Sequence, residues 1–385
     1  MSKPRPSIPI ANSKLSLRTI NLFVLHNLFL LTDADRPSSV LEVAERLVGL
    51  HAKRPQSPYL SLAARIPDFS VSQLDDVIYR RRQLLRTHAM RGTVHLLPLA
   101  QYRTILTASA GQLSGMYQRA FANLKNKPAI AKMVVELIIS RGPLTHEAIA
   151  SSLSIEIDER DLYRIINELC TDGVLIKASV DGSWRSAIYE YELLERWQPS
   201  IPKGEVDPGQ ARVRLLSWFL SAYAPATLKD LSWWTGLSER QVKDILALIE
   251  RPLMLVHFES LGSSGYIFED EFQKLEKWKP PRTTNVTLLP SFDPYVIAYI
   301  ERDRYIAKAN YAKIFRGVAG IIEPVMLIDG FIAGTWKYTV KKDRLVMQLF
   351  DGPTDVDFKE RLKTAEREMI AFLRAADLQT ASAKK

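Results

Sequence analysis

Hydrophobic positions along this 385-residue chain recur mostly at the three-to-four-residue spacing of helices. The first apolar run, INLFVLHNLFLL, is too short to span a bilayer and is interrupted by Asn21, His26 and Asn27. No small-residue cleavage site follows it, so we expect a buried first helix opened by Ser16 rather than a leader peptide. The run SSVLEVAERLVGL predicts another helix, capped by its serine pair.

The pattern is most regular between Pro128 and Val180. One helix is expected to end at Gly142, a short second helix to begin at Thr145, and a third to end at Gly173. The β-prone runs VLIKASV and RSAIYEYEL then predict a hairpin. Three helices followed by a hairpin is the order of a winged helix-turn-helix.

The same order returns in QARVRLLSWFLSAYAPATLKDLSWWTGLSERQVKDILALI, where Ser238 is expected to cap the third helix, followed by LMLVHFE and GYIFE as strands. The N-terminal segment has room for one more such unit, with SVSQLDDVIYRRRQLLRTHAM expected to begin as a helix and end towards the β-prone GTVHLLP.

From Asn285 onward, VTLLPSFDPYVIAYI, PVMLIDGFIAGTWKYTV and RLVMQLF predict short strands, and Asp329-Gly330 predicts a hairpin turn. A helix, FKERLKTAEREMIAFLRAA, is expected to follow. The predicted fold class is therefore α+β: three tandem winged helix-turn-helix domains plus a C-terminal β-barrel with a terminal helix. The expected domain ranges are 14–110, 125–200, 207–275 and 283–375.

Composition narrows the class of partner. A hydrophobic content of 46% with 25% charged residues is typical of a globular protein. The formal net charge of +9 favours a polyanionic partner such as DNA, RNA or an anionic membrane. The single cysteine, Cys170, excludes an internal disulfide and fits the cytoplasm, or the nucleoid of a bacterium. The six histidines lack paired ligand spacing, so neither zinc nor another cofactor is expected.

Five segments carry a more specific signal, in this order along the chain: LVGLHAKRPQSPYLSLAARI, MRGTVHLLP, PATLKDLSWWTGL, LLPSFDPYVIAYIERD and PVMLIDGFIAGTW. Together they resemble the AlkZ-like winged-helix DNA glycosylases, a family associated with removal of alkylated bases and unhooking of interstrand crosslinks. The resemblance covers roughly residues 15–375. It implies three winged helices and a β-barrel, and a DNA N-glycosylase that acts as a monomer, away from membranes, on double-stranded DNA containing alkylated or crosslinked bases.

The chain departs from this family at the segment after Gly49-Leu50. The family has a Gln, an apolar residue and then a Gln or Asp, and the two polar residues position the hydrolytic water. This chain has His51, Ala52 and Lys53. A neutral His51 suits water orientation or general-base chemistry. Lys53 is expected to contact a phosphate, or, if desolvated, to attack C1′ and act as a lyase; the remaining alternatives are an altered substrate and lost catalysis.

Asp293, in SFDP, is the third candidate catalytic residue, because a carboxylate near C1′ would offset the developing sugar cation; capping a turn before Pro294 is the alternative. Trp233 and Trp234 are expected in the core rather than as base-stacking platforms. The residues expected to contact DNA are Arg54, Arg80, Arg81, Arg82, Arg86, Arg91, His95, Lys337 and Tyr338.

Each of these groups has a structural alternative. Arg80, Arg81, Arg82 and Arg86 are expected on one helix, as a phosphate patch or as a solvated face. On a strand, Arg91, Thr93 and His95 would share one face, and they would either reach DNA or hold the strand to the first domain.

Two other functions remain open for the whole chain. One is a DNA-binding protein that has kept the scaffold but lost base excision. The other is a winged-helix protein that works in transcription or as a protein-interaction module.

Overall fold

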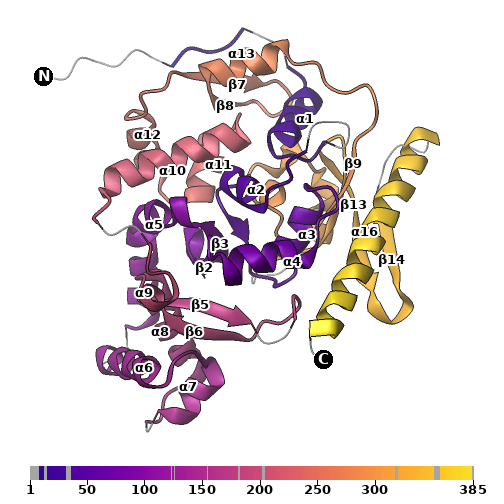
Figure 1. Ribbon diagram of the computed structural model, residues 1–385. Coiled ribbons are helices and arrows are strands. Elements are labelled where there is room, and N and C mark those ends of the chain that lie inside the picture. The colour runs from indigo at the N-terminus through magenta and orange to yellow at the C-terminus, as the bar shows by residue number, and fades with distance from the viewer. Residues whose placement is uncertain are drawn as a thin grey trace, which may run out of the picture.

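The computed structural model describes residues 8–12, 15–31, 36–122, 124, 126–153, 155–180, 183–201, 204–316, 320–350 and 356–383. Helices and strands alternate along the whole chain, which confirms the α+β class (Figure 1). Lys14 and Lys125, where two of the predicted domains begin, lie outside the described residues. Within the described part, no helix combines the length and apolar character needed to cross a membrane.

The N-terminal segment folds around a small antiparallel sheet of order β1-β3-β2. Two predicted helix starts are confirmed: the Ser16 hydroxyl accepts a hydrogen bond from the amide of Thr19, and that of Ser39 accepts one from the amide of Glu42. The elements are α1 (Leu17–Asn27), α2 (Val40–Arg46), β1 (Leu50–His51), α3 (Ser57–Ala63), α4 (Val71–Asp75), a π-helical turn (Asp76–Arg80), β2 (Leu84–His88), a 3₁₀ turn (Met90–Gly92), β3 (Val94–Pro98) and α5 (Leu99–Ala120).

The helix expected to carry four arginines is shorter than its pattern suggests. It ends at Arg80, and Arg82 adopts a positive φ of 54° that turns the chain into β2. Arg86 therefore lies on a strand, where it pairs with Leu96 of β3. Because β2 needs β3 as a partner from beyond the turn, local periodicity alone could not show where the helix ends.

The next two segments follow the predicted order of helices and hairpin. In the first, Thr145 caps the second helix, as predicted, and Asp158 caps the third. Gly173 follows the end of the third helix, also as predicted. Its elements are α6 (Lys127–Arg141), β4 (Leu144–Thr145), α7 (His146–Ser152), α8 (Glu159–Thr171), β5 (Leu175–Val180), β6 (Tyr189–Leu193) and α9 (Leu194–Trp197).

In the second of these segments Ser238 caps the third helix, as predicted. Its elements are α10 (Pro208–Tyr223), α11 (Leu228–Thr235), α12 (Glu239–Leu246), β7 (Leu253–Phe258), β8 (Ser263–Phe268) and α13 (Glu269–Lys277). The strands β7 and β8 form an antiparallel pair, which confirms the predicted hairpin.

The C-terminal segment contains an open sheet, and the predicted β-barrel is wrong. The described strands have the order β14-β13-β12-β9, with β9 and β14 at opposite edges. After Leu289 the chain leaves the sheet, because Pro290 has no amide to donate, Phe292 has a φ of 62° and Asp293 caps a short helix. Too few strands remain to close, and the long helix α16 runs along the sheet instead (Figure 1).

This segment consists of β9 (Val286–Leu289), α14 (Pro294–Ile297), 3₁₀ turns (Arg302–Arg304 and Lys308–Asn310), α15 (Tyr311–Ile314), the pair β10 (Phe315–Arg316) and β11 (Ile321–Ile322), β12 (Val325–Ile328), β13 (Phe331–Thr339), a 3₁₀ turn (Val340–Lys342), β14 (Arg344–Leu349) and α16 (Val356–Ala383). The hairpin at Asp329-Gly330 is confirmed, and both of its central residues have positive φ.

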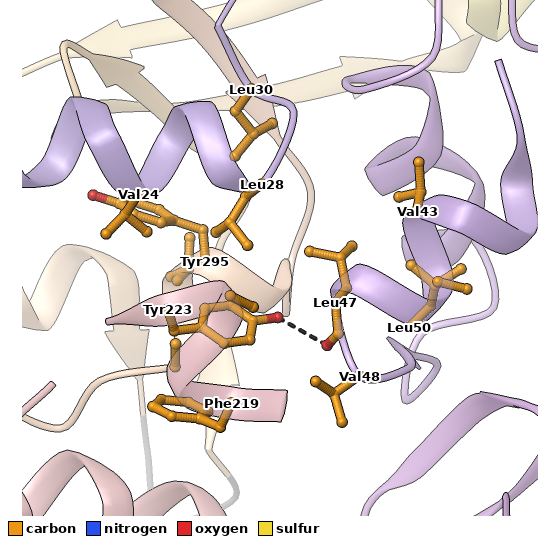
Figure 2. Packing of buried hydrophobic residues seen from close by; sticks show 14 of the residues in the cluster. Val24, Leu28, Leu30, Val43, Leu47, Val48, Leu50, Phe219, Tyr223 and Tyr295 are labelled. Carbon is orange, nitrogen blue, oxygen red and sulfur yellow. Dashed lines mark hydrogen bonds between the residues drawn. The ribbon is translucent and has the colours of Figure 1, made fainter. Parts of the chain in front are cut away.

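The main hydrophobic core is built mostly from the first, third and fourth predicted domain ranges, and Ile176, Ala178, Trp184 and Leu194 of the second range join it. Figure 2 shows side chains of α1, α2, α10 and α14 converging in it, where the hydroxyl of Tyr223 donates to the carbonyl of Leu47 at 2.9 Å. The segment from α6 to β6 has its own core, to which the end of α5 contributes Tyr117 and Phe121. The first, third and fourth segments are therefore held in fixed relation around one core.

Candidate active site

A pocket of about 710 Å³ lies where the first, third and C-terminal segments meet. His51 and Lys53 both line it, so these two sequence neighbours share one site. Arg91 and Thr93 line it too, from the turn before β3. The other described lining residues are Gln112, Ser232, Trp233, Gly236, Leu237, Phe292, Val296, Ile297, Tyr299, Arg302, Phe315, Arg316, Gly320, Ile321 and Ile322.

An extended backbone places His51 and Lys53 on one side. His51 ends β1 opposite His95 of β3, and the next amide, of Ala52, donates to the carbonyl of Val94 at 2.8 Å. Residues two apart on an extended chain point the same way, whereas on a helix they would diverge. Gly49 makes this pairing feasible: it has a φ of 94°, and a Cβ there would lie 2.8 Å from Leu97 and 3.1 Å from the carbonyl oxygen of Leu96.

Hydrogen bonds fix which ring nitrogens carry protons in the histidine pair. Nδ1 of His95 lies 2.8 Å from the carbonyl oxygen of Thr93, so it donates and leaves Nε2 with the lone pair. Nδ1 of His51 accepts from the amide of Lys53 at 3.4 Å, so a neutral His51 carries its proton on Nε2. His51, which lines the pocket, therefore has Nε2 as its hydrogen-bond donor.

Burial keeps both rings neutral. It lowers the pKa of His51 well below its usual value, and the charges of His95, Arg91 and Lys53 lower it further. Burial also lowers the pKa of His95 to about 4. A His51 that resists protonation and already presents an N–H is suited to holding a water molecule and poorly suited to taking a proton from it.

Phe292 contacts both His51 and Lys53, a role that sequence reasoning missed. Its ring stacks on His51 with centroids 5.0 Å apart and planes 9° apart, and the Lys53 ammonium lies 5.0 Å from its centroid. The positive φ of Phe292 places its ring there, and a phenylalanine in that conformation is unusual. The ring therefore fixes the plane of the imidazole and the direction of the lysine side chain.

Arg91 and Trp233 form the opposite wall. The guanidinium of Arg91 lies 4.6 Å from the centroid of the Trp233 indole, and burial lowers the pKa of Arg91 to about 10. Arg91 has a φ of 57°, and its amide donates to the side chain of Gln112 at 3.2 Å. It lies in the 3₁₀ turn before β3, so the predicted strand face shared by Arg91, Thr93 and His95 is wrong.

Trp234 lies in the core as predicted, but Trp233 is 38% exposed, and its assignment to the core is wrong. Adjacent residues on one helix point about 100° apart, so the doubled tryptophan already indicated that only one of them would face inward.

A second pocket, of about 410 Å³, adjoins the first, because Ile321 and Ile322 line both. Arg54, Lys337 and Tyr338, three of the residues expected to contact DNA, line it together. The hydroxyl of Tyr338 donates to Asp343 at 2.7 Å, while Lys337 is exposed. The structure thus brings these three side chains to the edge of the main pocket.

The remaining arginines do not form one patch. Arg80 and Arg81 are exposed and both pair with Asp76, at 3.6 and 2.6 Å. Arg82 stacks on Trp197 at 4.1 Å and donates to its carbonyl. Arg86 is buried, and its guanidinium donates to the hydroxyl of Tyr189 at 2.7 Å. A common phosphate-binding face for all four is therefore wrong, because the chain turns between Arg81 and Arg86.

Asp293 lies beside the pocket in sequence but behind its wall in space. Its carboxylate is 0% exposed and pairs with Arg65, also 0% exposed, at 2.8 Å. It accepts from the hydroxyl of Ser61 at 2.7 Å and from the amide of Tyr295 at 3.0 Å, and so caps α14. These contacts favour the capping interpretation that the sequence left open. In the described chain, no three His, Cys, Asp or Glu residues gather in a way that would hold a metal ion.

Comparisons with known proteins agree with this geometry. The family model described as "DNA glycosylase AlkZ-like" matches residues 44–372. The chain is 24% identical over 360 residues to the "Interstrand DNA cross-link repair glycosylase" of Streptomyces sahachiroi, covering 88% of this chain and 91% of that protein. The solved structure of the DNA glycosylase AlkZ of the same organism matches with a TM-score of 0.78 at 22% identity, over 95% of this chain and 98% of that one, which shows the same fold. With its motifs, pocket and fold in agreement, the chain belongs to the AlkZ-like DNA glycosylase family.

Proposed function

We propose that this protein excises alkylated or crosslinked purines from double-stranded DNA by cleaving the N-glycosidic bond, and that His51 holds the attacking water. The observation that carries this proposal is that His51 and Lys53 line one pocket, and that the hydrogen bond accepted by Nδ1 of His51 leaves its proton on Nε2. The relative from Streptomyces sahachiroi, named for interstrand crosslink repair, supports crosslinks as part of the substrate range.

The reaction follows from this arrangement. The bond from C1′ to the base nitrogen breaks with both electrons remaining on the base, and a water oxygen bonds to C1′. The water proton passes through solvent, and the base nitrogen takes up a proton where it needs one. Since the leaving base does most of the bond breaking, the protein has to position water and substrate rather than abstract a proton. A donated hydrogen bond from His51 to the water oxygen leaves the second water lone pair directed at C1′.

The proposed grip on DNA comes from the surfaces beside the pocket. Trp233 offers a ring face at its rim, and Arg54, Lys337 and Tyr338 border it from the C-terminal sheet. We propose that the helix-and-hairpin segments at 14–110, 125–200 and 207–275 act as three winged helices, as their order of elements supports. We also propose that the protein works as a monomer in the cytoplasm.

The lyase alternative depends on Lys53. A lysine nucleophile has to be desolvated, and Lys53 is exposed. We therefore propose hydrolysis by a monofunctional enzyme, with Lys53 acting through its charge.

The test is base release from three duplexes: one with a single 7-methylguanine, one with its ring-opened form, and one with a defined interstrand crosslink. Free base is quantified by mass spectrometry, and strand cleavage is followed with alkali, without alkali and with borohydride. Strand cleavage that needs alkali indicates a monofunctional glycosylase. A borohydride-trapped complex that Lys53→Ala abolishes makes Lys53 the nucleophile. No release from any duplex, with binding retained, leaves a DNA-binding protein that has lost excision.

A further inference from the structure

The pocket is lined by cations without a carboxylate among its described residues. Lys53, Arg91, Arg302 and Arg316 line it, and no lining residue is aspartate or glutamate. Arg316 has a partner outside the lining, Glu323, at 3.5 Å. The guanidinium of Arg302 lies 3.6 Å from the ring centroid of Phe315, which is also part of the wall. The pocket is therefore positively charged on an aromatic and apolar surface.

One nearby acid, Glu323, offsets the charge of Arg316, and three other acids are paired with cations outside the lining. Asp293 is held by Arg65 behind the wall. Glu301 pairs with Lys229 at 3.8 Å, and Asp303 pairs with Lys308 at 3.5 Å. With four lysines and arginines and no carboxylate among the described lining residues, the pocket keeps a net positive lining after the Arg316–Glu323 pair is counted.

Arg91 is the cation whose charge is least screened by water. It is largely buried, and its Nε has no hydrogen-bond partner in the described structure. Coulomb interactions are several times stronger there than between exposed groups. A ligand entering the pocket therefore meets a positive field that solvent does not remove.

We propose that this pocket selects damaged bases that carry no formal charge before excision, a refinement that rests on the proposed glycosylase function. A base alkylated on a ring nitrogen of the purine is a cation, and the lining cations repel it. A neutral damaged base is not repelled, and it becomes an anion as it takes the electron pair from C1′. The transition state of the neutral base therefore carries no net charge, with its negative end on the base beside Lys53 and Arg91.

The selection acts on kcat/KM rather than on kcat. Both kinds of base gain one negative charge between the bound state and the transition state, so the chemical step responds to the cations alike. The difference is the repulsion of the whole cationic substrate, which is present from binding onward. Suitable neutral substrates are ring-opened purines and bases modified at an exocyclic atom.

The test compares two duplexes that differ in the charge of one base: 7-methylguanine, a cation, and its ring-opened derivative, which is neutral. We measure kcat/KM for base release by the wild type, Lys53→Gln and Arg91→Gln. Lys53→Arg and Arg91→Lys retain the charge and serve as matched controls, and Lys363→Gln on the exposed face of α16 controls for net charge. Because every variant sees the same two substrates, their different chemical lability cancels when ratios are compared.

The expected result is that the neutral-to-cationic ratio of kcat/KM falls by about tenfold or more for each glutamine substitution, while the charge-retaining variants and Lys363→Gln keep the wild-type ratio. An unchanged ratio in both glutamine variants overturns the proposal. In that case the affinity for DNA is measured at several salt concentrations. A slope of log affinity against log salt concentration that is smaller by about one in those variants would show that the two cations contact phosphates.

If neither duplex releases base, the proposed function fails, and charge selection is decided separately by the affinities of the two duplexes for the same variants.

Discussion

Replacing Asp293 by asparagine separates a structural carboxylate from a catalytic one. The substitution keeps the shape of the side chain but removes the counterion of Arg65, and both groups are 0% exposed. The guanidinium then retains only the carbonyl oxygens of Leu28 and Ser61, at 3.0 and 2.8 Å, and one amide oxygen. Breaking a buried ion pair on one side costs about 3–5 kcal/mol. We therefore expect Asp293→Asn to lower the free energy of unfolding by about this amount.

The assay combines denaturant unfolding, followed by tryptophan fluorescence, with base release at a temperature where the variant remains folded. We expect base release per folded molecule to stay within about threefold of the wild type, because the carboxylate does not reach the pocket. The double variant Arg65→Met/Asp293→Leu removes both charges and should recover most of the lost stability. A variant with wild-type stability and no base release would refute this reasoning and return Asp293 to the chemistry.

Three further predictions test the site. His51→Gln supplies an amide donor and should keep the rate of base release within about tenfold of the wild type. His51→Phe keeps the stacking on Phe292 but has no donor, and its rate should fall on the order of a hundredfold. Equal losses in the two variants would show that His51 is not a donor. Folding lowers the pKa of His95 from its usual 6.5 to about 4. As the pH falls, the unfolded chain therefore binds this proton before the folded protein does. The stability that is present above pH 6.5 is lost as the pH falls towards 4. In denaturant titrations, His95→Gln should make the fall in the free energy of unfolding between pH 6.5 and pH 4 smaller by on the order of 3 kcal/mol. An unchanged dependence of this free energy on pH would contradict the prediction. Gly236→Ala should lower stability by about 1 kcal/mol and slow base release, because the new Cβ would lie 2.1 Å from Gln112, which holds Arg91; normal activity would show that this contact yields freely.

The positions of most helices and hairpins follow from the sequence, because their signals are local. Ser16, Ser39, Thr145 and Ser238 each cap the helix that their position indicated. The hairpin at Asp329-Gly330 needs positive φ at two successive residues, which that dipeptide favours. Short-range hydrogen bonds and backbone preferences suffice to place such elements.

The sequence also identified the residues that share the pocket, His51, Lys53 and Arg91, through their motifs. It did not identify Phe292 or Gln112, which hold them, because positive φ at a phenylalanine and a hydrogen bond from α5 are not local signals. Nor did it show that Asp293 faces Arg65 rather than the pocket.

Only the tertiary structure decided these last features, together with the open sheet and the end of the helix at Arg80. Each depends on a partner outside the segment itself: Arg65 for Asp293, the following strand β3 for β2, and α16 for the face of the C-terminal sheet. The physical reason is that a buried charge or an unpaired strand is stable only with a partner, and its partner is chosen when the whole chain packs. The sequence by itself determined which residues are available for chemistry, and packing determined which of them line the pocket.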